Sequence, residues 1–350
     1  MNLLPASATH SDQVTIEGAF CRETVASKAL VGNPLKDPSE RTAWVYTPPG
    51  YEQSDRRYPV VYFLHGYLGR VDTWWNWKPW RPAFPELVDQ LFRDPTVNPA
   101  IVVLVDAWTS LGGSQYLNSP GTGQYLDYLA EDVVEAVDSR YRTIADRDHR
   151  ALSGKSSGGY GAMVATMLRP DVFGAFATHA GDCAFETSYF MDIAGAARAL
   201  RDRYGGSYER FFEDFWSRPA LFLDPTGPDH RLINIYAMAA CYSAEPDGTV
   251  SLPWDLETMA IRYDVWERWQ ELDPIRLAGS KVDALRSLRA IWVDAGNRDD
   301  YYMDLGAQAF SARLRSFGIE HHFELFDAPH AGIEHRYPLA LRYIVERLNT

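Results

Sequence analysis

The chain has 350 residues, of which 46% are hydrophobic and 23% are charged, an ordinary composition for a compact globular protein. Its formal charge of −13 and the lack of any Lys/Arg cluster argue against binding to nucleic acid or to an anionic membrane surface, because both need a basic footprint. The first residues contain neither a basic segment nor an apolar run of signal-peptide length, and no stretch has 18 consecutive apolar residues. We therefore expect a cytoplasmic protein that does not insert into membranes.

Short apolar segments alternate with helical patterns along most of the chain, which is the order expected of a mainly parallel sheet covered by helices. The predicted strands are residues 43–46, 60–64, 101–105, 150–152, 175–179, 290–293 and 322–326. The spacing of apolar positions predicts helices at residues 126–140, 158–168, 303–317 and 334–348. This pattern predicts an α/β fold, and we interpret residues 1–350 as one domain.

Residues 182–273 interrupt the alternation of strands and helices. They are rich in Phe, Tyr and Trp, with helical patterns at residues 194–204, 208–216 and 256–272, and "YGG" at 204–206 marks a helix stop. A strand pattern resumes afterwards and no Pro/Ser-rich linker flanks the segment. We predict a mostly helical, cap-like insertion within the domain that shapes a pocket. The alternative is a helical extension that only packs on the core.

The sequence "SGKSSGG" at residues 153–159 matches two kinds of glycine-rich turn. A phosphate-binding loop of the form GxxxxGK[ST] would need glycine at position 149, which is histidine. The alternative, G-x-S-x-G, is satisfied by Gly154, Ser156 and Gly158, with "RAL" before it as a short strand and "GYGAMVATML" after it as a helix. A serine on a tight turn from strand to helix is typical of a nucleophile, so Ser156 is the candidate.

A serine nucleophile needs a base, and the base needs an acid that orients it. The segment "RAIWVDAGNRDD" predicts a strand that runs into a loop, which places Asp299 or Asp300 just beyond the strand's carboxyl end. Asp294 is a further candidate acid, although its position at the end of the strand favours burial. The residues alone leave the choice among these carboxylates open.

The candidate base is His330, in the segment "HFELFDAPHAGIEH", where a predicted strand runs into a loop. The other histidines nearby lie at the start of that strand (His321 and His322) or in a predicted helix (His335). The chain order serine, aspartate, histidine is the order found in α/β-hydrolases. Order, spacing and strand-end position together favour His330.

The segment "VVYFLHGYLG" at residues 60–69 predicts a strand and a loop that supply an oxyanion hole. The expected backbone N–H donors are those of Tyr67 and of Ser157, the residue after the nucleophile. Gly66 would let the chain pass close to a substrate. We interpret His65 as a residue that braces this loop by hydrogen bonding.

Tryptophans are dense in "DTWWNWKPW" at residues 72–80, directly after that loop. Trp74 and Trp75 are candidates for a wall of the substrate pocket, because indole rings stack on aromatic and sugar groups. Packing in the core or at an interface is the equal alternative. No HExxH motif or comparable ligand set occurs, so we expect neither a metal nor an organic cofactor.

Several segments together resemble one family, the putative esterase (esterase D-like) branch of the α/β-hydrolases. This branch includes S-formylglutathione hydrolases, feruloyl esterases, enterochelin esterases and mycolyltransferases. The resemblance covers about residues 40–182 and 270–348. The matching segments are "VYTPPGYEQSDRRYPVVYFLHG", "YLDYLAEDVVEAVDSRYRT", "RALSGKSSGGYGAM", "RPDVFGAFATHAGD", "DPIRL", "VDAGNRDDYY" and "DAPHAG".

The resemblance implies an α/β-hydrolase fold and assigns roles by position. Ser156 stands where the family has its nucleophile and His330 where it has its base. The acid usually lies three residues after the glycine of G-x-x-D, which selects Asp299 over Asp300. Tyr67 and Ser157 match the oxyanion positions.

The chain departs from the family pattern on both sides of the nucleophile. Lys155 stands where an apolar residue is common, and Ser157 stands where Met is common. Neither change removes a catalytic group. Both concern substrate preference, because the side chain at position 157 can approach the acyl pocket.

The function expected from these residues is hydrolysis of a small or medium carboxylic ester through an acyl-enzyme formed on Ser156. Two alternatives use the same fold: an acyltransferase with the same triad, and a binding protein without catalytic activity. The expected partner is a small-molecule ester. A homo-oligomer is compatible with the sequence, which does not define an oligomeric state.

Overall fold

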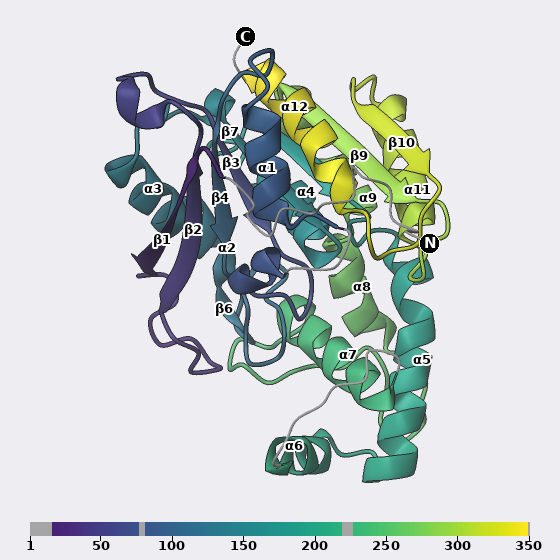
Figure 1. Cartoon of the computed structure of the whole chain (residues 1–350). Coiled ribbons are helices and arrows are strands. Elements are labelled where there is room, and N and C mark those ends of the chain that lie inside the picture. Colours follow the sequence, from purple (N-terminus) through teal and green to yellow (C-terminus); the bar gives the residue numbers. More distant parts are fainter. Residues whose placement is uncertain (1–15, 77–80, 219–226, 349–350) are drawn as a thin grey trace, which may run out of the picture.

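The computed structural model describes residues 16–76, 81–218 and 227–348, and its centre is an eight-stranded sheet in the order β1-β2-β4-β3-β7-β8-β9-β10 (Figure 1). β2 pairs antiparallel with both β1 and β4, whereas the strands from β4 to β10 are mutually parallel. The strands are β1 (Ala19–Ala26), β2 (Glu40–Thr47), β3 (Val60–Leu64), β4 (Ile101–Val105), β7 (Arg150–Lys155), β8 (Ala175–His179), β9 (Ala290–Gly296) and β10 (His322–Phe326).

All seven strands predicted from the sequence are present in this sheet. Sequence reasoning missed β1, an edge strand that pairs only with β2 and whose residues are mostly exposed or half-buried. A polar edge strand lacks the continuous apolar run by which buried parallel strands are found. A separate ribbon, β5 (Asn118–Ser119) with β6 (Gly123–Gln124), lies outside the main sheet.

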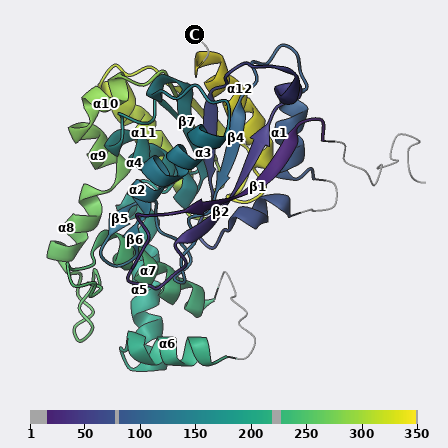
Figure 2. The ribbon, with the colours of Figure 1, turned by 90° about the vertical axis from the view of Figure 1, so that its left-hand side faces the viewer.

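Helices cover both faces of the sheet, so it is buried between two apolar layers. α1 and α12 pack on one face, and α3, α4 and α11 on the other (Figures 1 and 2). A π-helical turn at Tyr128–Val133 joins α2 and α3 into one helical stretch. In the described residues, the α-helices outside residues 182–273 are α1 (Phe84–Phe92), α2 (Tyr125–Asp127), α3 (Val134–Arg140), α4 (Ser157–Leu168), α9 (Pro274–Ser280), α10 (Val282–Arg286), α11 (Met303–Ser316) and α12 (Tyr337–Leu348).

Strand β3 shows how the sheet separates the two layers. Tyr62 and Leu64 face the layer that includes α4, while Val61 and Phe63 face the layer of α1 and α12. All five residues of the strand are fully buried, as expected for a strand covered on both faces. The Phe63 ring contacts the rings of Phe84, on α1, and of Tyr337, on α12.

The described part of residues 182–273 forms four helices that lie together beyond the carboxyl ends of the parallel strands (Figures 1 and 2). These helices are α5 (Phe185–Tyr204), α6 (Tyr208–Ser217), α7 (Pro228–Tyr242) and α8 (Tyr263–Glu271). The predicted stop is present, since Gly205 ends α5 in the left-handed conformation at φ 60°.

The helix prediction in this segment was wrong at three places. The helix expected at residues 194–204 begins at Phe185, and α7 was not predicted. The helix expected at residues 256–272 begins only at Tyr263, because Asp255 accepts hydrogen bonds from the N–H groups of Glu257 and Thr258 and closes a turn instead.

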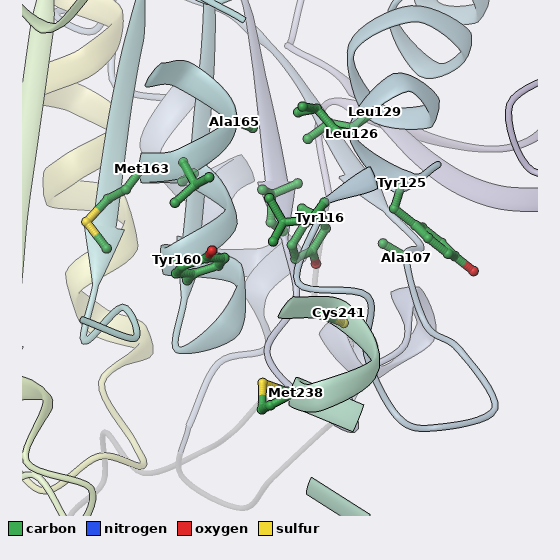
Figure 3. Close-up of a cluster of buried hydrophobic side chains, with 14 of the residues drawn as sticks. Ala107, Tyr116, Tyr125, Leu126, Leu129, Tyr160, Met163, Ala165, Met238 and Cys241 are labelled. Atoms are coloured by element: carbon green, nitrogen blue, oxygen red, sulfur yellow. The ribbon is translucent and has the colours of Figure 1, made fainter. Parts of the chain in front are cut away.

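Helix α7 is joined to the rest of the molecule by apolar packing (Figure 3). Met238 and Cys241 of α7 belong to the same buried cluster as Tyr160 and Met163 of α4. The ring of Tyr160 also lies 5.8 Å from that of Tyr242, at the end of α7. The helices of the insertion therefore share a core with the helix that follows Ser156.

We expect Phe63→Ala to lower the free energy of unfolding by about 3–5 kcal/mol, because it leaves a cavity between the sheet and two helices. Chemical denaturation followed by circular dichroism measures this loss. Tyr263→Ala is the control, since that side chain is 74% exposed and its truncation should change stability by less than about 0.5 kcal/mol. Equal losses in the two variants would contradict the packing described for β3.

Candidate active site

Ser156 lies in a tight turn between β7 and α4, and its backbone is strained, with φ 57° and ψ −128°. The turn fits only because glycines flank it. A Cβ on Gly154 would lie 2.8 Å from the carbonyl oxygen of Leu64, and one on Gly158 would overlap that oxygen. The N–H of Ser156 donates to the carbonyl oxygen of His179 at 3.0 Å, which ties the turn to β8.

Asp299 and His330 are brought together by the loops after β9 and β10. His330 Nδ1 is 2.7 Å from Asp299 Oδ2, and the other carboxylate oxygen accepts the N–H of Tyr301 at 2.9 Å. The Asp299 side chain is fully buried and that of His330 is 11% exposed. With its Nδ1 proton directed at the carboxylate, the imidazole has Nε2 available as a base.

The other two candidate carboxylates lie elsewhere. Asp300 Oδ2 accepts the backbone N–H of His330 at 3.3 Å, so it holds the loop rather than the imidazole. Asp294 is completely buried below the site, between His179 Nδ1 at 2.7 Å and Arg336 Nε at 3.0 Å. Burial acts to raise the pKa of Asp294, but His179, a hydrogen bond from an indole and Arg336 hold it below its ordinary value.

The competing histidines have other neighbours. His321 Nε2 is 2.7 Å from Ser311 Oγ, and His322 stacks on Trp292 at 3.7 Å between ring centroids. His335 lines the same cavity as His330, but its ring packs against that of Phe326 at 5.8 Å.

His65 holds the loop that follows β3. Its Nε2 accepts the N–H of Ala107 at 3.0 Å, so Nδ1 carries the proton and donates to the carbonyl oxygen of Gly66 at 2.9 Å. That oxygen also accepts the N–H of Gly69 at 2.9 Å. Because carbonyl and N–H of one trans peptide point in opposite directions, fixing the Gly66 carbonyl also fixes the N–H of Tyr67.

The loop passes directly beside Ser156. A Cβ on Gly66 would lie 3.4 Å from Ser156 Cβ. Tyr67 and Ser157 line the same cavity as Ser156, and neither backbone N–H has an acceptor within the part of the chain that the structure describes. Two unpaired N–H groups beside a serine hydroxyl can stabilise an oxyanion.

These groups open into one cavity of about 740 Å³ that is lined by two dissimilar sets of residues. One set comes from residues 182–273, and its polar members are Asp182, Ser188, Tyr189, Asp192, His230 and Asn234. The other set comes from the segment around α1 and the loop after β10, and its members include Trp74, Arg81, Phe84, Glu334, His335 and Tyr337.

The two candidate tryptophans, Trp74 and Trp75, lie in different places in the structure. Trp74 lines the cavity and packs against Phe84 at 4.7 Å between ring centroids. Trp75 is not among the cavity residues. Its ring packs on Trp44 at 4.9 Å and on Phe20 at 5.0 Å, at the side of β1 and β2. The expectation of a pocket contact for Trp75 was therefore wrong, and its alternative, packing on the sheet, describes its position.

Sequence reasoning missed Asp182, whose Oδ1 lies 3.5 Å from Ser156 Oγ. It follows β8 in the segment "HAGD", so the rule that placed Asp299 after a strand would also have found it. Tyr189, Asp192 and His230 were missed because they come from helices whose packing the sequence pattern does not indicate. In the described residues, no group of three His, Cys, Asp or Glu side chains could hold a metal ion.

The family model described as putative esterase matches residues 37–337. The chain belongs to this family. The resemblance seen in the sequence is thereby confirmed, and the fold is that of an α/β-hydrolase. Over residues 16–76, 81–218 and 227–348, no helix is both long enough and apolar enough to span a bilayer.

Curated relatives match part of the chain. An endo-1,4-beta-xylanase/feruloyl esterase of Xylanibacter ruminicola is 30% identical over 138 residues, which are 38% of this chain and 18% of that protein. An esterase of Mycobacterium tuberculosis is 27% identical over 170 residues, 47% of this chain and 34% of that protein. The chain thus matches about a third or less of the length of these relatives.

Solved structures match nearly the whole chain at low identity. A ferulic acid esterase is 19% identical with a TM-score of 0.60, covering 95% of this chain and 100% of that chain. An S-formylglutathione hydrolase from Agrobacterium tumefaciens is 17% identical with a TM-score of 0.59, covering 97% and 99%. At this identity the two structures establish the shared fold.

We expect Gly158→Ala to lower the free energy of unfolding by about 1–3 kcal/mol, since a methyl group would overlap the Leu64 carbonyl and push α4 away from β3. Gly195→Ala, in α5, is the matched control. Its new methyl group would meet only the flexible Arg231 side chain, so we expect little change. Thermal unfolding compares the two, and an unaffected Gly158→Ala protein would contradict the close approach of α4 to β3.

The contribution of His65 to stability should depend on pH. Burial lowers its pKa, although the nearby Asp106 carboxylate opposes the shift. The unfolded chain, whose histidine pKa is about 6.5, therefore takes up a proton before the folded one. The contribution of neutral His65 to stability should be complete above that pH and decline below it, by up to about 1.4 kcal/mol per pH unit.

Urea unfolding of wild type and His65→Gln between about pH 8 and pH 5 measures this dependence. Glutamine keeps a donor and an acceptor but does not titrate. The difference in stability between the two proteins should shrink as the pH falls below about 6.5. A constant difference would show that His65 does not titrate with unfolding.

Proposed function

We propose that this protein is a carboxylesterase-type serine hydrolase with Ser156 as nucleophile, His330 as base and Asp299 as the acid that orients it. The observation that supports this most strongly is that Ser156, on its strained turn, lines the same cavity as His330, whose Nδ1 is 2.7 Å from Asp299 Oδ2. Membership of the putative esterase family agrees with the chemistry.

In the proposed reaction, His330 Nε2 takes the proton of Ser156 Oγ as that oxygen attacks the ester carbonyl. The N–H groups of Tyr67 and Ser157 stabilise the oxyanion of the tetrahedral intermediate. His330 then gives the proton to the leaving alcohol, and an acyl-enzyme remains on Ser156. Water repeats the sequence, which releases the carboxylic acid and restores the serine.

The hydroxyl of Ser156 rests near Asp182 Oδ1, at 3.5 Å, a distance at the weak limit of hydrogen bonding. We expect the hydroxyl to turn about the Cα–Cβ bond toward His330 when an ester occupies the cavity. Catalytic hydrogen bonds are often long or misaligned without substrate and tighten in the complex.

We propose that the insertion of residues 182–273 is a cap that forms one wall of the substrate site. Its helices α5 and α7 contribute Tyr189, Asp192, His230 and Asn234 to the cavity. The cavity volume of about 740 Å³ is within the range of small-molecule sites and supports a small or medium ester.

The proposed assay uses p-nitrophenyl esters from acetate to octanoate, with methyl ferulate and S-formylglutathione beside them. The last two correspond to the names of similar proteins, a feruloyl esterase and an S-formylglutathione hydrolase. The preferred chain length reports the size of the acyl site. Ser156→Ala should abolish hydrolysis of every substrate in the set.

We expect Asp299→Asn to lower kcat/KM by about 10³- to 10⁴-fold, because an amide cannot hold the imidazole in the required tautomer or stabilise its cation. Asp300→Asn is the matched control. Its carboxylate accepts a backbone N–H instead of the imidazole, so the loss should stay below about tenfold.

Equal effects of the two asparagine variants would contradict the role proposed for Asp299. A folded wild type that cleaves no ester would overturn the proposed hydrolase. If hydrolysis is slow and an added alcohol captures the acyl group in preference to water, the triad functions in an acyltransferase.

A further inference from the structure

Asp182 is a buried carboxylate beside the nucleophile that the proposed mechanism does not use. It lies in the loop between β8 and α5, is 5% exposed and lines the cavity. The loop is held in an unusual conformation, since Ala180 and Ala184 have φ values of 46° and 54°. Non-glycine residues in this region are strained, and such strain is concentrated at functional sites.

One oxygen of this carboxylate is fully occupied. Asp182 Oδ2 accepts from Gln115 Nε2 at 3.2 Å, from Ser157 Oγ at 3.2 Å and from the Tyr189 hydroxyl at 3.0 Å. Gln115 is itself fixed, because its Nε2 also donates to the Tyr242 hydroxyl at 2.7 Å. Three donors from three segments thus set the orientation of the carboxylate. Ser157, the residue after Ser156, provides one of them.

The other oxygen is left for a ligand. Asp182 Oδ1 is directed at Ser156, and its one contact in the described residues is the long 3.5 Å approach to Ser156 Oγ. Water can satisfy this oxygen while the cavity is empty. An acyl group that displaces the water leaves a buried acceptor unpaired unless the acyl group brings a donor of its own.

The geometry of the reaction indicates which part of the ester lies here. The leaving alcohol must be next to His330, which protonates it. The loop that carries His330 continues through Glu334 and His335 to Tyr337, whose ring lies 5.8 Å from that of Trp74. With the alcohol on this side, the acyl group lies beside Asp182, and a substituent on its α carbon is separated from Ser156 Oγ only by the carbonyl and α carbons.

We propose that Asp182 makes the enzyme selective for acyl groups that carry a hydroxyl or an ammonium group next to the ester carbonyl. This inference rests on the proposed function and specifies its substrate class. Other polar residues of the cavity, among them Ser188 and Asn234, come from α5 and α7. A plain alkyl chain would leave Asp182 Oδ1 without a partner, whereas an α-hydroxy or α-amino acyl group pairs with this oxygen directly.

The test compares p-nitrophenyl glycolate with p-nitrophenyl propionate, whose acyl groups have nearly the same shape but differ in the hydroxyl. Each kcat/KM is divided by the rate of hydroxide-catalysed hydrolysis, and p-nitrophenyl methoxyacetate serves as an ether without a donor. Burial raises the pKa of the Asp182 carboxyl above its ordinary value, so the assay is run at about pH 8, which favours the carboxylate. We expect wild type to prefer glycolate by about 10- to 100-fold over propionate and over methoxyacetate.

Asp182→Asn should reduce that preference at least about fivefold. The donors around Oδ2 hold the amide oxygen in that place, so the amide nitrogen faces Ser156 and an acceptor becomes a donor. Asp202→Asn is the matched control. Its carboxylate also lies on α5, pairs with Arg201 at 2.7 Å and does not line the cavity, so the ratio between the two esters should not change.

If Asp182→Asn does not fold, Ser157→Ala provides the second variant, because loss of one donor loosens the carboxylate and should weaken the preference. If wild type hydrolyses both esters at similar corrected rates and this hydrolysis depends on Ser156, the inference is wrong and the proposed function stands. A preference for glycolate that survives unchanged in Asp182→Asn would have the same consequence. Failure of folded wild type to cleave these two esters while it cleaves others of the series from acetate to octanoate would overturn the inference alone, and failure with every ester would overturn the proposed function and the inference together.

Discussion

The close contact between helix α4 and the end of strand β3 is the constraint on which the rest of the site depends. Gly158 packs so close to the carbonyl oxygens of Leu64 and His65 that any side chain at this position would overlap them. The contact brings the loop of Gly66 and Tyr67 beside Ser156. The Ser156 hydroxyl and the N–H groups of Tyr67 and Ser157 are therefore positioned by backbone packing, which would cost no reorganisation during a reaction. Other strained residues, among them Leu68 and Tyr302, lie in the loops around the same point.

The parallel sheet positions the other residues of the site. Neighbouring strands β3, β7, β8, β9 and β10 are followed at their carboxyl ends by His65, Ser156, Asp182, Asp299 and His330. Strands lie about 4.8 Å apart, so consecutive strand ends present side chains at intervals that hydrogen bonds can bridge. The site is thus one edge of a sheet, and its residues are distant in sequence because each parallel strand needs a crossover before the next.

Within the described residues, two hydrogen-bonded histidine–aspartate pairs lie at this edge, and burial separates their roles. His179 and Asp294 are both fully buried, and Arg336 and Trp292 complete the surroundings of the carboxylate. His330 reaches the cavity, while its partner Asp299 is buried behind it. The first pair joins β8, β9 and the segment before α12 below the site. The second alone presents an imidazole nitrogen to a ligand.

The sequence by itself determined the strands of the parallel sheet, the Ser156 turn and the order of the serine, the carboxylate and the histidine. These features are local: a strand buried on both faces is a continuous apolar run, and a glycine-flanked serine between strand and helix is a short motif. It could not locate α7 or the start of α5 and α8, where the helical pattern depends on packing between segments that share no local signal.

Only the tertiary structure decided which side chains share the cavity. Trp74 and Trp75 are adjacent in sequence, yet one lines the cavity and the other packs on β1 and β2, because successive residues of a short helical turn face different directions. The same holds for Asp182, whose position beside Ser156 follows from the pairing of β7 with β8. Sequence fixes what a residue can do chemically, but contacts between distant segments decide which residue it meets, since burial and hydrogen bonding are properties of the folded chain.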